Sequence, residues 1–229
     1  MRPAFHWRWL GRMEFSKALA LQEEIVAKKR EKRTAPDELL LLEHDAVYTI
    51  GKTPDQSSLI DPSRLPHPLF TINRGGQATY HGPGQLIGYP IIDLRRCGQD
   101  LHRYLRWLED LLIKTLRLFR ISARTRVGLT GVWVENRKIA SIGVGVRHWI
   151  TMHGFALNVS GDLTPFDRII PCGIANVTMT SIEKEVRKIY SPEEVSRRVA
   201  EIAFQSIANL TTDGSLIQIS LQPDNAFLL

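Results

Sequence analysis

The chain has 229 residues and a formal net charge of +6, and 43% of its residues are hydrophobic and 24% charged. This balance is ordinary for a soluble globular protein, and the length suits a domain with a substantial core. Its two cysteines, Cys97 and Cys172, are too few for a disulfide scaffold and fit a reducing compartment. No apolar run approaches the roughly 20 residues of a membrane span, and Met1–Leu10 does not resemble a secretory signal. We therefore expect a cytoplasmic location and no membrane partner.

The positive charge predicts acidic partners. The densest basic cluster, residues 28–33, ends a predicted helix and can equally be a solvated helix end, where cations suit the helix dipole. No nucleic-acid motif is present, and aromatic residues are not interleaved with the basic ones. We therefore expect no nucleic-acid partner.

The first half of the chain predicts a helix followed by strands. Residues 14–33 form an amphipathic pattern, and residues 37–49 read as one buried strand built on a run of four leucines. Residues 51–68 are rich in Pro, Ser and Asp and predict a loop. A short strand over 69–73 leads into a glycine-rich segment, and residues 85–93 predict another strand.

The second half predicts two long helices around a hairpin. Leucines recur at helical spacing over residues 100–119, and residues 130–134 and 138–146 flank a short turn. A strand over 150–159 follows, and residues 191–210 predict a C-terminal helix with a capping box formed by Ser191 and Glu194. Because strands and helices mix without strict alternation, we predict an α+β fold with a mixed, largely antiparallel sheet and flanking helices.

Cys172 lies in the segment FDRIIPCGI, between Pro171 and Gly173. Proline and glycine constrain the backbone there to a turn, which can hold a thiol at a fixed angle toward a pocket. The alternative is a buried, inert thiol, as most free cysteines are. Cys97, beside Gly98 at a predicted strand-to-helix boundary, is interpreted as structural.

Residues 74–85, RGGQATYHGPGQ, form the glycine-rich segment. Its glycines let the backbone approach a ligand closely, but the spacing is neither that of a phosphate-binding Walker loop nor that of a dinucleotide fingerprint. A long surface turn is the alternative. The polar side chains within it favour one wall of a pocket: Arg74, Thr79, Tyr80 and His81.

Two further segments are candidate walls of the same pocket. Lys138 opens KIASIGVG, and an ammonium close to a thiol favours the nucleophilic thiolate, although Lys138 can also be a solvated residue at a hairpin turn. In MHGFALN, from Met152, His153 can serve as a base, as can His81, or either can be a hydrogen-bonded structural residue. No cysteine and histidine group has metal-ligand spacing, so we expect no metal site.

Four stretches together resemble the octanoyltransferases, the lipoate-protein ligase B family. They are RGGQATYHGPGQLIGYP from Arg74, GVWVENRKIASIGV from Gly131, HGFALNV from His153 and FDRIIPCGI from Phe166. The resemblance extends over about residues 39–181. The ordered set is highly specific, although residues 177–182 fit the family's Val-Thr-Ser-Leu only loosely.

This resemblance implies a single catalytic domain over residues 1–229, an α/β sandwich like that of biotin and lipoate protein ligases. The nucleophilic cysteine of the family lies in a Pro-Cys-Gly motif, which corresponds to Cys172 here. The resemblance implies that Cys172 attacks the thioester of octanoyl-acyl carrier protein and forms an octanoyl-enzyme. The acyl group then passes to a lysine of lipoyl domains, those of 2-oxoacid dehydrogenase E2 subunits and of the glycine cleavage H protein. No ATP or other cofactor is required, because the thioester is already activated.

The resemblance also implies roles for individual residues. Lys138 stabilises the thiolate and moves protons, Gly173 offers an oxyanion donor through its N–H, and His153 gives possible catalytic support. The expected substrate-binding residues are Arg74, Gly75, Gly76, Gln77, Ala78, Thr79, Tyr80, His81, Ser141, Ile142, Gly143, Gly154, Phe155 and Ala156.

Three other functions remain open at this stage. An ATP-dependent lipoate ligase of the same fold would activate a free acid without a cysteine nucleophile. A non-catalytic module would only bind acylated carriers. A thioesterase would differ in the final acceptor, with water in place of lysine.

Overall fold

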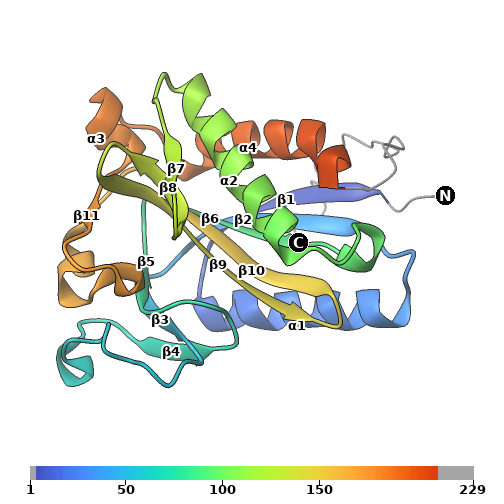
Figure 1. Cartoon of the computed structure of the whole chain (residues 1–229), viewed down its shortest axis with the longest axis horizontal. Coiled ribbons are helices and arrows are strands. Elements are labelled where there is room, and N and C mark those ends of the chain that lie inside the picture. The colour runs from blue at the N-terminus through green and yellow to red at the C-terminus, as the bar shows by residue number, and fades with distance from the viewer. Residues whose placement is uncertain (1–3, 211–229) are drawn as a thin grey trace.

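The computed structural model describes residues 4–210, in which helices cover both faces of a twisted β-sheet (Figure 1). No helix within these residues has the length and apolar character needed to cross a membrane. The helices are α1 (Phe15–Glu31), α2 (Leu101–Leu118), α3 (Ile182–Val186) and α4 (Pro192–Ser206). The strands are β1 (Phe5–Met13), β2 (Asp37–His44), β3 (Val47–Gly51), β4 (Leu69–Ile72), β5 (Thr79–His81), β6 (Gln85–Ile91), β7 (Arg124–Arg126), β8 (Leu129–Val134), β9 (Arg137–Arg147), β10 (Ile150–Asn158) and β11 (Thr178–Met179).

The strands form two sheets. The large sheet has the order β1-β2-β6-β10-β9-β8-β7, with β11 paired to β9, and the small sheet has the order β4-β3-β5. Within residues 4–210, only the pairs β1–β2, β9–β11 and β3–β4 are parallel. The predicted mixed, largely antiparallel sheet with flanking helices is therefore confirmed.

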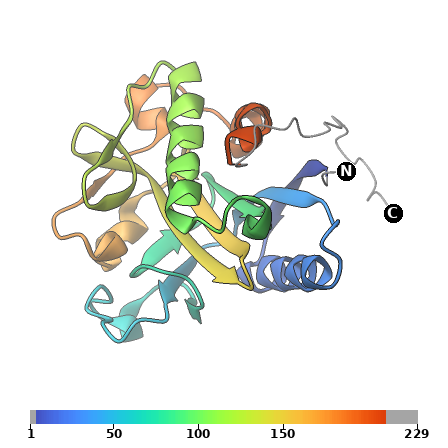
Figure 2. The ribbon, with the colours of Figure 1, turned by 45° about the vertical axis from the view of Figure 1, so that its right-hand side comes forward.

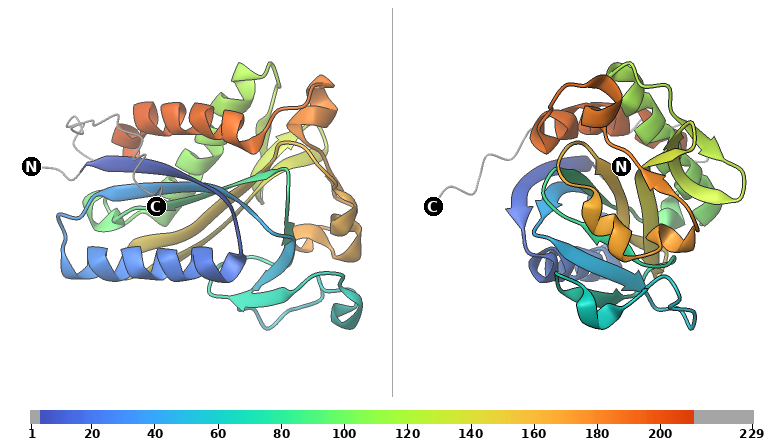
Figure 3. Two further views of the ribbon diagram at one scale, coloured as in Figure 1. Left: turned by 180° about the vertical axis from the view of Figure 1, so that it is seen from behind. Right: turned by 90° about the vertical axis from the view of Figure 1, so that its left-hand side faces the viewer.

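The leucine run of β2 explains why helices lie on both faces of the large sheet. Successive side chains of a strand point to opposite faces. Leu39 and Leu41 accordingly pack in a cluster with α2 and α4, whereas Leu40 and Leu42 pack in another cluster with α1. Figures 2 and 3 show α2 and α4 on one side of the sheet and α1 on the other. Each fully buried leucine contributes roughly 1.5–3 kcal/mol through burial.

The prediction of one strand over residues 37–49 is wrong, because the segment divides into β2 and β3, which belong to different sheets. The last β2 residue paired with β6 is Leu42. At Asp45 the chain turns away, where the Asp45 N–H donates to the Met13 carbonyl (3.4 Å) and the Asp45 carboxylate accepts from Arg12 Nε (2.8 Å). Both partners come from the end of β1, so no local pattern indicates the break.

β1 was not predicted, although its sequence holds a signal for it. Phe5, Trp7 and Trp9 alternate with polar residues and pack on the cluster that α2 and α4 cover. The C-terminal helix was predicted more closely, and its capping box is confirmed, since Ser191 and Glu194 exchange side-chain-to-backbone hydrogen bonds. The predicted domain range 1–229 includes residues 1–3 and 211–229, which lie outside the described part of the chain.

The small sheet holds the cysteine turn beside the large sheet. Tyr48 of β3 and Tyr80 of β5 pack with Phe166 and Ile169, which precede the short turn Pro171–Gly173. The Cys172 N–H then donates to the Ala78 carbonyl (2.8 Å), directly before β5. Through this packing, the end of one loop is fixed against strands that lie about a hundred residues earlier in the chain.

Candidate active site

A cavity of about 250 Å³ lies between the two sheets. Most of the predicted site residues line it: Arg74, Gly76, Gln77, Thr79, His81, Lys138, Ser141, Ile142, Gly143, His153, Gly154, Phe155, Ala156 and Cys172. Sequence reasoning did not identify the remaining lining residues, which are Phe15, Ile72, Tyr89, Gly128, Leu129, Thr130 and Ile174. The cavity is therefore lined by four predicted segments that lie far apart in the sequence: the glycine-rich segment, the segments that begin at Lys138 and at His153, and the cysteine turn.

Four predicted site residues do not line this cavity. The Gly75 N–H donates to the Val144 carbonyl (3.0 Å), which joins the glycine-rich segment to β9. Ala78 is buried below the cysteine turn, and Tyr80 packs in the core of the small sheet. The Gly173 N–H donates to the Ile170 carbonyl (2.9 Å) within the turn, so this amide is engaged in the turn itself.

Cys172 has an uncommon backbone conformation. Its φ of 56° and ψ of 19° place it in the left-handed region, which non-glycine residues seldom adopt and which is often found at functional sites. The next residue, Gly173, also has a positive φ, and a Cβ there would lie 2.8 Å from Gln77 Cγ. The Pro-Cys-Gly turn therefore fixes the direction of the thiol, as the sequence suggested.

The thiol points to β9. Cys172 Sγ lies 3.6 Å from Ser141 Oγ, at hydrogen-bonding distance for sulfur, and Lys138 from the same strand lines the cavity beside them. Lys138 is 1% exposed, so it is not the solvated turn residue that the sequence also allowed. Its Nζ lies 5.4 Å from the centre of the Trp133 ring, at cation–π distance.

The strand next to Lys138 is shaped to leave room for its side chain. Gly131 has a φ of +127°, and a Cβ at this position would lie 2.8 Å from Lys138 Cε. The Gly131 N–H donates to Oε1 of Glu109 (3.1 Å), a buried carboxylate on α2 whose other oxygen pairs with Arg106 (2.5 Å). Sequence reasoning missed Glu109, because nothing in a helix pattern shows which distant amide a buried carboxylate meets.

Arg74 organises the glycine-rich wall. Its guanidinium donates to the Thr49 carbonyl (2.9 Å), to Thr49 Oγ1 (3.0 Å) and to the Gln77 carbonyl (3.0 Å). Burial lowers the pKa of Arg74, while the negative charge of a Cys172 thiolate acts in the opposite direction. The guanidinium therefore interacts electrostatically with the thiolate form of Cys172.

The histidines of the site are neutral near pH 7. Burial is the main cause that lowers the pKa of His81 to about 3 and the pKa of His153 to about 4, and nearby positive charge adds to the effect. His81 is held between Gln85 Oε1 (2.8 Å) and Thr49 Oγ1 (3.3 Å). His44, which was not predicted, approaches the Tyr89 hydroxyl at 2.7 Å, and burial lowers its pKa to about 4.

Gln22 of α1 is a second support that sequence reasoning missed. Its side-chain oxygen accepts a hydrogen bond from the His153 N–H (2.7 Å), where His153 has a φ of 57° inside β10. This contact crosses from the helix to the strand and stabilises an irregular position, from which the imidazole lines the cavity. No group of three or more His, Cys, Asp or Glu residues within 4–210 is arranged to hold a metal ion.

Comparison with known proteins shows the family to which the chain belongs. A family model described as the lipoyl protein ligase A/B catalytic domain matches residues 14–204. An octanoyltransferase from Geotalea uraniireducens (strain Rf4) is 52% identical over 190 residues, which cover 83% of this chain and 87% of that protein.

Two solved structures share the fold at low sequence identity. A bi-partite lipoate protein ligase from Thermoplasma acidophilum has a TM-score of 0.68 at 15% identity, covering 98% of this chain and 87% of that chain. A biotin protein ligase from Aquifex aeolicus, in complex with biotin and ATP, has a TM-score of 0.55 at 13% identity, covering 91% of this chain and 72% of that chain. The expected likeness to the catalytic domains of lipoate and biotin ligases is confirmed.

The fold is thus the one shared by lipoate and biotin protein ligases. The chain belongs to the lipoyl protein ligase A/B catalytic-domain family, and its curated relatives within that family are octanoyltransferases. It is an acyltransferase for octanoyl transfer in protein lipoylation.

Proposed function

We propose that this chain takes an octanoyl group from octanoyl-acyl carrier protein onto Cys172 and passes it to a lysine of a lipoyl domain. The observation that supports this most directly is the convergence of Cys172, Ser141 and Lys138 on one cavity. These residues belong to two of the four stretches that resemble the octanoyltransferases, GVWVENRKIASIGV and FDRIIPCGI. A nucleophile, a hydroxyl and a buried cation in one cavity are the parts that covalent acyl transfer needs.

In the first half-reaction, the Cys172 thiolate attacks the carbonyl carbon of the donor thioester. The carbon–sulfur bond to the carrier breaks, and the carrier sulfur leaves as a thiol after taking a proton from Lys138. The products are octanoyl-Cys172 and a neutral Lys138 amine. In this proposal, Lys138 and Arg74 supply positive charge to the cavity in which the sulfur reacts.

In the second half-reaction, the neutral amine of the acceptor lysine attacks the octanoyl-Cys172 carbonyl. The new carbon–nitrogen bond forms, the Cys172 sulfur leaves as a thiolate, and the proton of the amine returns to Lys138. The amide product and the starting enzyme are regenerated without ATP. The thioester supplies the driving force for both steps.

The remaining cavity residues bind and orient the acyl chain in this proposal. Ile142, Phe155 and Ala156 offer apolar surface, Gly143 leaves room for Arg74 of the glycine-rich segment, and Gly154 allows β10 to lie close to β6. A Cβ at Gly154, for example, would lie 2.3 Å from the Gly88 carbonyl oxygen. Because His81 and His153 are neutral near pH 7, we assign them hydrogen-bonding roles instead of roles as cations.

The oxyanion donor expected at Gly173 needs a change in the turn. Its N–H already donates to Ile170, and the Cys172 N–H donates to Ala78. We therefore propose that Gly173 acts mainly by allowing the turn. An oxyanion role for its amide requires that the bond to Ile170 opens when the donor binds.

An ATP-dependent ligase is the second candidate, because the fold is shared with ligases. Such an enzyme joins the acyl group to AMP and does not need a thiol. The left-handed Cys172 turn against Ser141 has no function in that reaction, which favours the transferase.

Intact mass spectrometry tests the proposal. The chain is incubated with octanoyl-acyl carrier protein without ATP, and a lipoyl domain is then added. We expect an octanoyl adduct on Cys172 that disappears as the lipoyl domain gains the same mass. Acceptor modification that requires ATP and free octanoate, with no adduct, would instead identify a ligase.

Two variants sharpen the experiment. Cys172→Ser should abolish the adduct. The matched control is Cys97→Ser, because Cys97 is buried in the core and burial raises the pKa of its thiol to about 11. Full transfer by Cys172→Ser would remove Cys172 from the mechanism.

A further inference from the structure

One stretch of the chain carries almost all of its excess positive charge. Residues 111–134 include five basic residues and no Asp or Glu, whereas the whole chain has 30 basic and 24 acidic residues. The stretch therefore supplies five of the six net charges. It comprises the C-terminal part of α2, a turn, β7 and all of β8.

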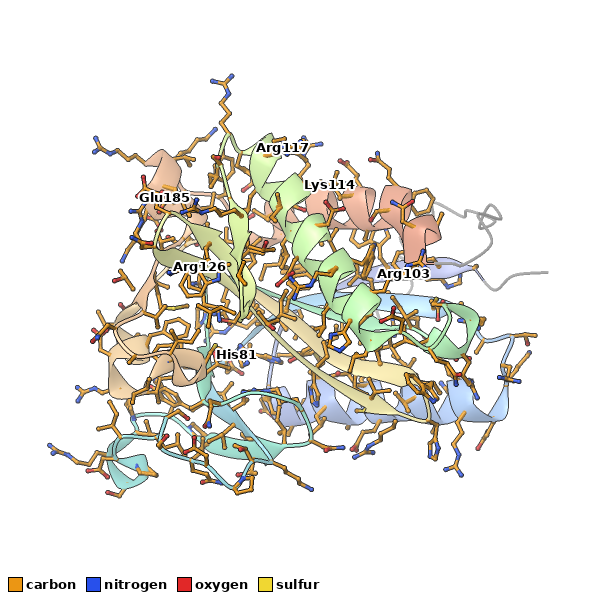
Figure 4. All side chains as sticks on the ribbon, in the orientation of Figure 1. His81, Arg103, Lys114, Arg117, Arg126 and Glu185 are labelled. Carbon is orange, nitrogen blue, oxygen red and sulfur yellow. The ribbon has the colours of Figure 1, made fainter. Side chains whose placement is uncertain are left out.

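Most of these charges lie on the surface beside apolar side chains. Arg117, Arg120, Arg124 and Arg126 are exposed. Leu118 and Val127 are 53% and 104% exposed, which is unusual for large hydrophobic residues. We call these six residues the basic ridge: Arg117, Leu118, Arg120, Arg124, Arg126 and Val127. Figure 4 shows Arg117 on α2 and Arg126 on the neighbouring strand.

The arginines of the ridge are not neutralised by the protein. Within residues 4–210, none of the four forms an ion pair with an acidic side chain. By contrast, Lys114, one turn earlier on α2, pairs with Asp110 at 2.6 Å. The combination of unpaired guanidinium groups and exposed apolar side chains is typical of a surface that binds an acidic partner.

The ridge ends at the mouth of the cavity. Gly128, Leu129 and Thr130, which directly follow Val127, line the cavity. The guanidinium of Arg126 lies 4.9 Å from the centre of the Trp133 ring, and the ammonium of Lys138 lies 5.4 Å from the same centre. A partner bound along the ridge would therefore be next to the cavity that holds Cys172.

We propose that the basic ridge docks the acyl donor, an acidic carrier protein whose acyl group is borne on an arm joined through a phosphodiester. This inference rests on the proposed function. The donor brings acidic side chains and a phosphodiester, both of which attract guanidinium groups. The acceptor must bring a lysine ammonium to the same cavity, and the ridge repels that charge. The charge of the ridge therefore favours the donor over the acceptor.

The test reverses charge on the ridge without changing the cavity. The ridge variant is Arg117→Glu/Arg120→Glu/Arg124→Glu, which leaves Arg126 and its contact with Trp133 intact. The control variant is Arg30→Glu/Lys32→Glu/Arg33→Glu, which changes the net charge equally at three exposed positions at the end of α1. The rate of octanoyl-Cys172 formation is measured in quenched reactions at several donor concentrations, which gives kcat/KM. The measurement is made at low salt and at about 0.5 M salt.

Three substrates separate docking from chemistry. With octanoyl-acyl carrier protein, the ridge variant should lose about 10-fold or more in kcat/KM at low salt, and the loss should shrink as salt screens the charges. With octanoyl-pantetheine, which has neither the carrier nor a phosphate, the ridge variant should match the wild type within about 2-fold. Transfer from preformed octanoyl-enzyme to a lipoyl domain should also be unchanged.

Several results would overturn the proposal. An equal loss in both triple variants would show a general charge effect, and a loss confined to the acceptor step would assign the ridge to the lipoyl domain. A ridge variant that uses the carrier as well as the wild type does would leave the ridge without this role. Failure of the proposed function is seen separately, because the wild type would then form no Cys172 adduct from either donor.

Discussion

The substitution Gly131→Ala should impair both stability and catalysis, and the loss of catalysis is what separates it from a merely strained variant. Gly131 has a φ of +127°, which residues other than glycine rarely adopt. Alanine at this position would therefore be strained by about 1–3 kcal/mol. The new Cβ would lie 2.7 Å from the Ala140 carbonyl oxygen and 2.8 Å from Lys138 Cε. A shift of the Lys138 side chain relieves the second contact, whereas the first, with a backbone atom of β9, is relieved only if the backbones of β8 and β9 also shift.

The size of the effect follows from the role of Lys138. Proton transfer by a positioned side chain typically contributes about 10²–10⁴-fold to the rate. Displacement of the ammonium should therefore lower kcat by roughly 100-fold, within that range, while KM for octanoyl-acyl carrier protein changes little. Gly11→Ala is the matched control, because Gly11 has a φ of +65° and a Cβ there would meet nothing within 4 Å.

The assay combines urea denaturation with single-turnover formation of octanoyl-Cys172. Gly11→Ala should lose about 1–2 kcal/mol of stability through backbone strain and keep its transfer rate. Gly131→Ala should lose at least as much stability and also its transfer rate. If Gly131→Ala transfers as fast as Gly11→Ala, the reasoning fails, since the methyl group would not reach Lys138 or Lys138 would not be needed.

Three other predictions concern stability and support of the site. Burial lowers the pKa of His44 from 6.5 to about 4. The neutral His44 side chain therefore contributes fully to stability above about pH 6.5. As the pH falls toward 4, this contribution declines by up to about 1.4 kcal/mol per pH unit. His44→Phe should flatten the dependence of the urea midpoint on pH in that window, and an unchanged slope would contradict this. Lys29→Ala should cost about 1–3 kcal/mol in a urea titration, because it removes a buried side chain that donates to the Asp37 carboxylate (2.7 Å) and to the Pro36 carbonyl (2.6 Å), although Arg96 still pairs with Asp37. Lys28→Ala, at an exposed helix pair, should cost at most about 0.5 kcal/mol, and equal losses in the two variants would be the contrary result. Glu109→Gln keeps an acceptor for the Gly131 N–H and should retain most of the transfer rate. Glu109→Ala should lower the rate about 10-fold and shift the pH profile for alkylation of Cys172. Equal rates in the two variants would exclude Glu109 as a positioning residue.

The segments that can be predicted from the sequence are those specified by near neighbours. The leucine spacing of α2 and the Ser191–Glu194 capping box depend on residues three or four positions apart. Both features can therefore be recognised from the local sequence alone. The Pro-Cys-Gly turn at Cys172 is local in the same sense. The glycine-rich segment indicated a cavity wall because its residue types require close backbone approach or polar partners.

Contacts between distant residues were decided only by the tertiary structure. The break between β2 and β3 depends on partners at the end of β1, and the room for Lys138 depends on Gly131 and on Glu109 from α2. Likewise, the neutral state of His81 follows from burial, which is a property of the packed fold and not of the motif. Strand pairing brings together residues that are far apart in the chain, and packing then removes water from them. The local amino-acid sequence does not indicate which distant residues will meet in this way.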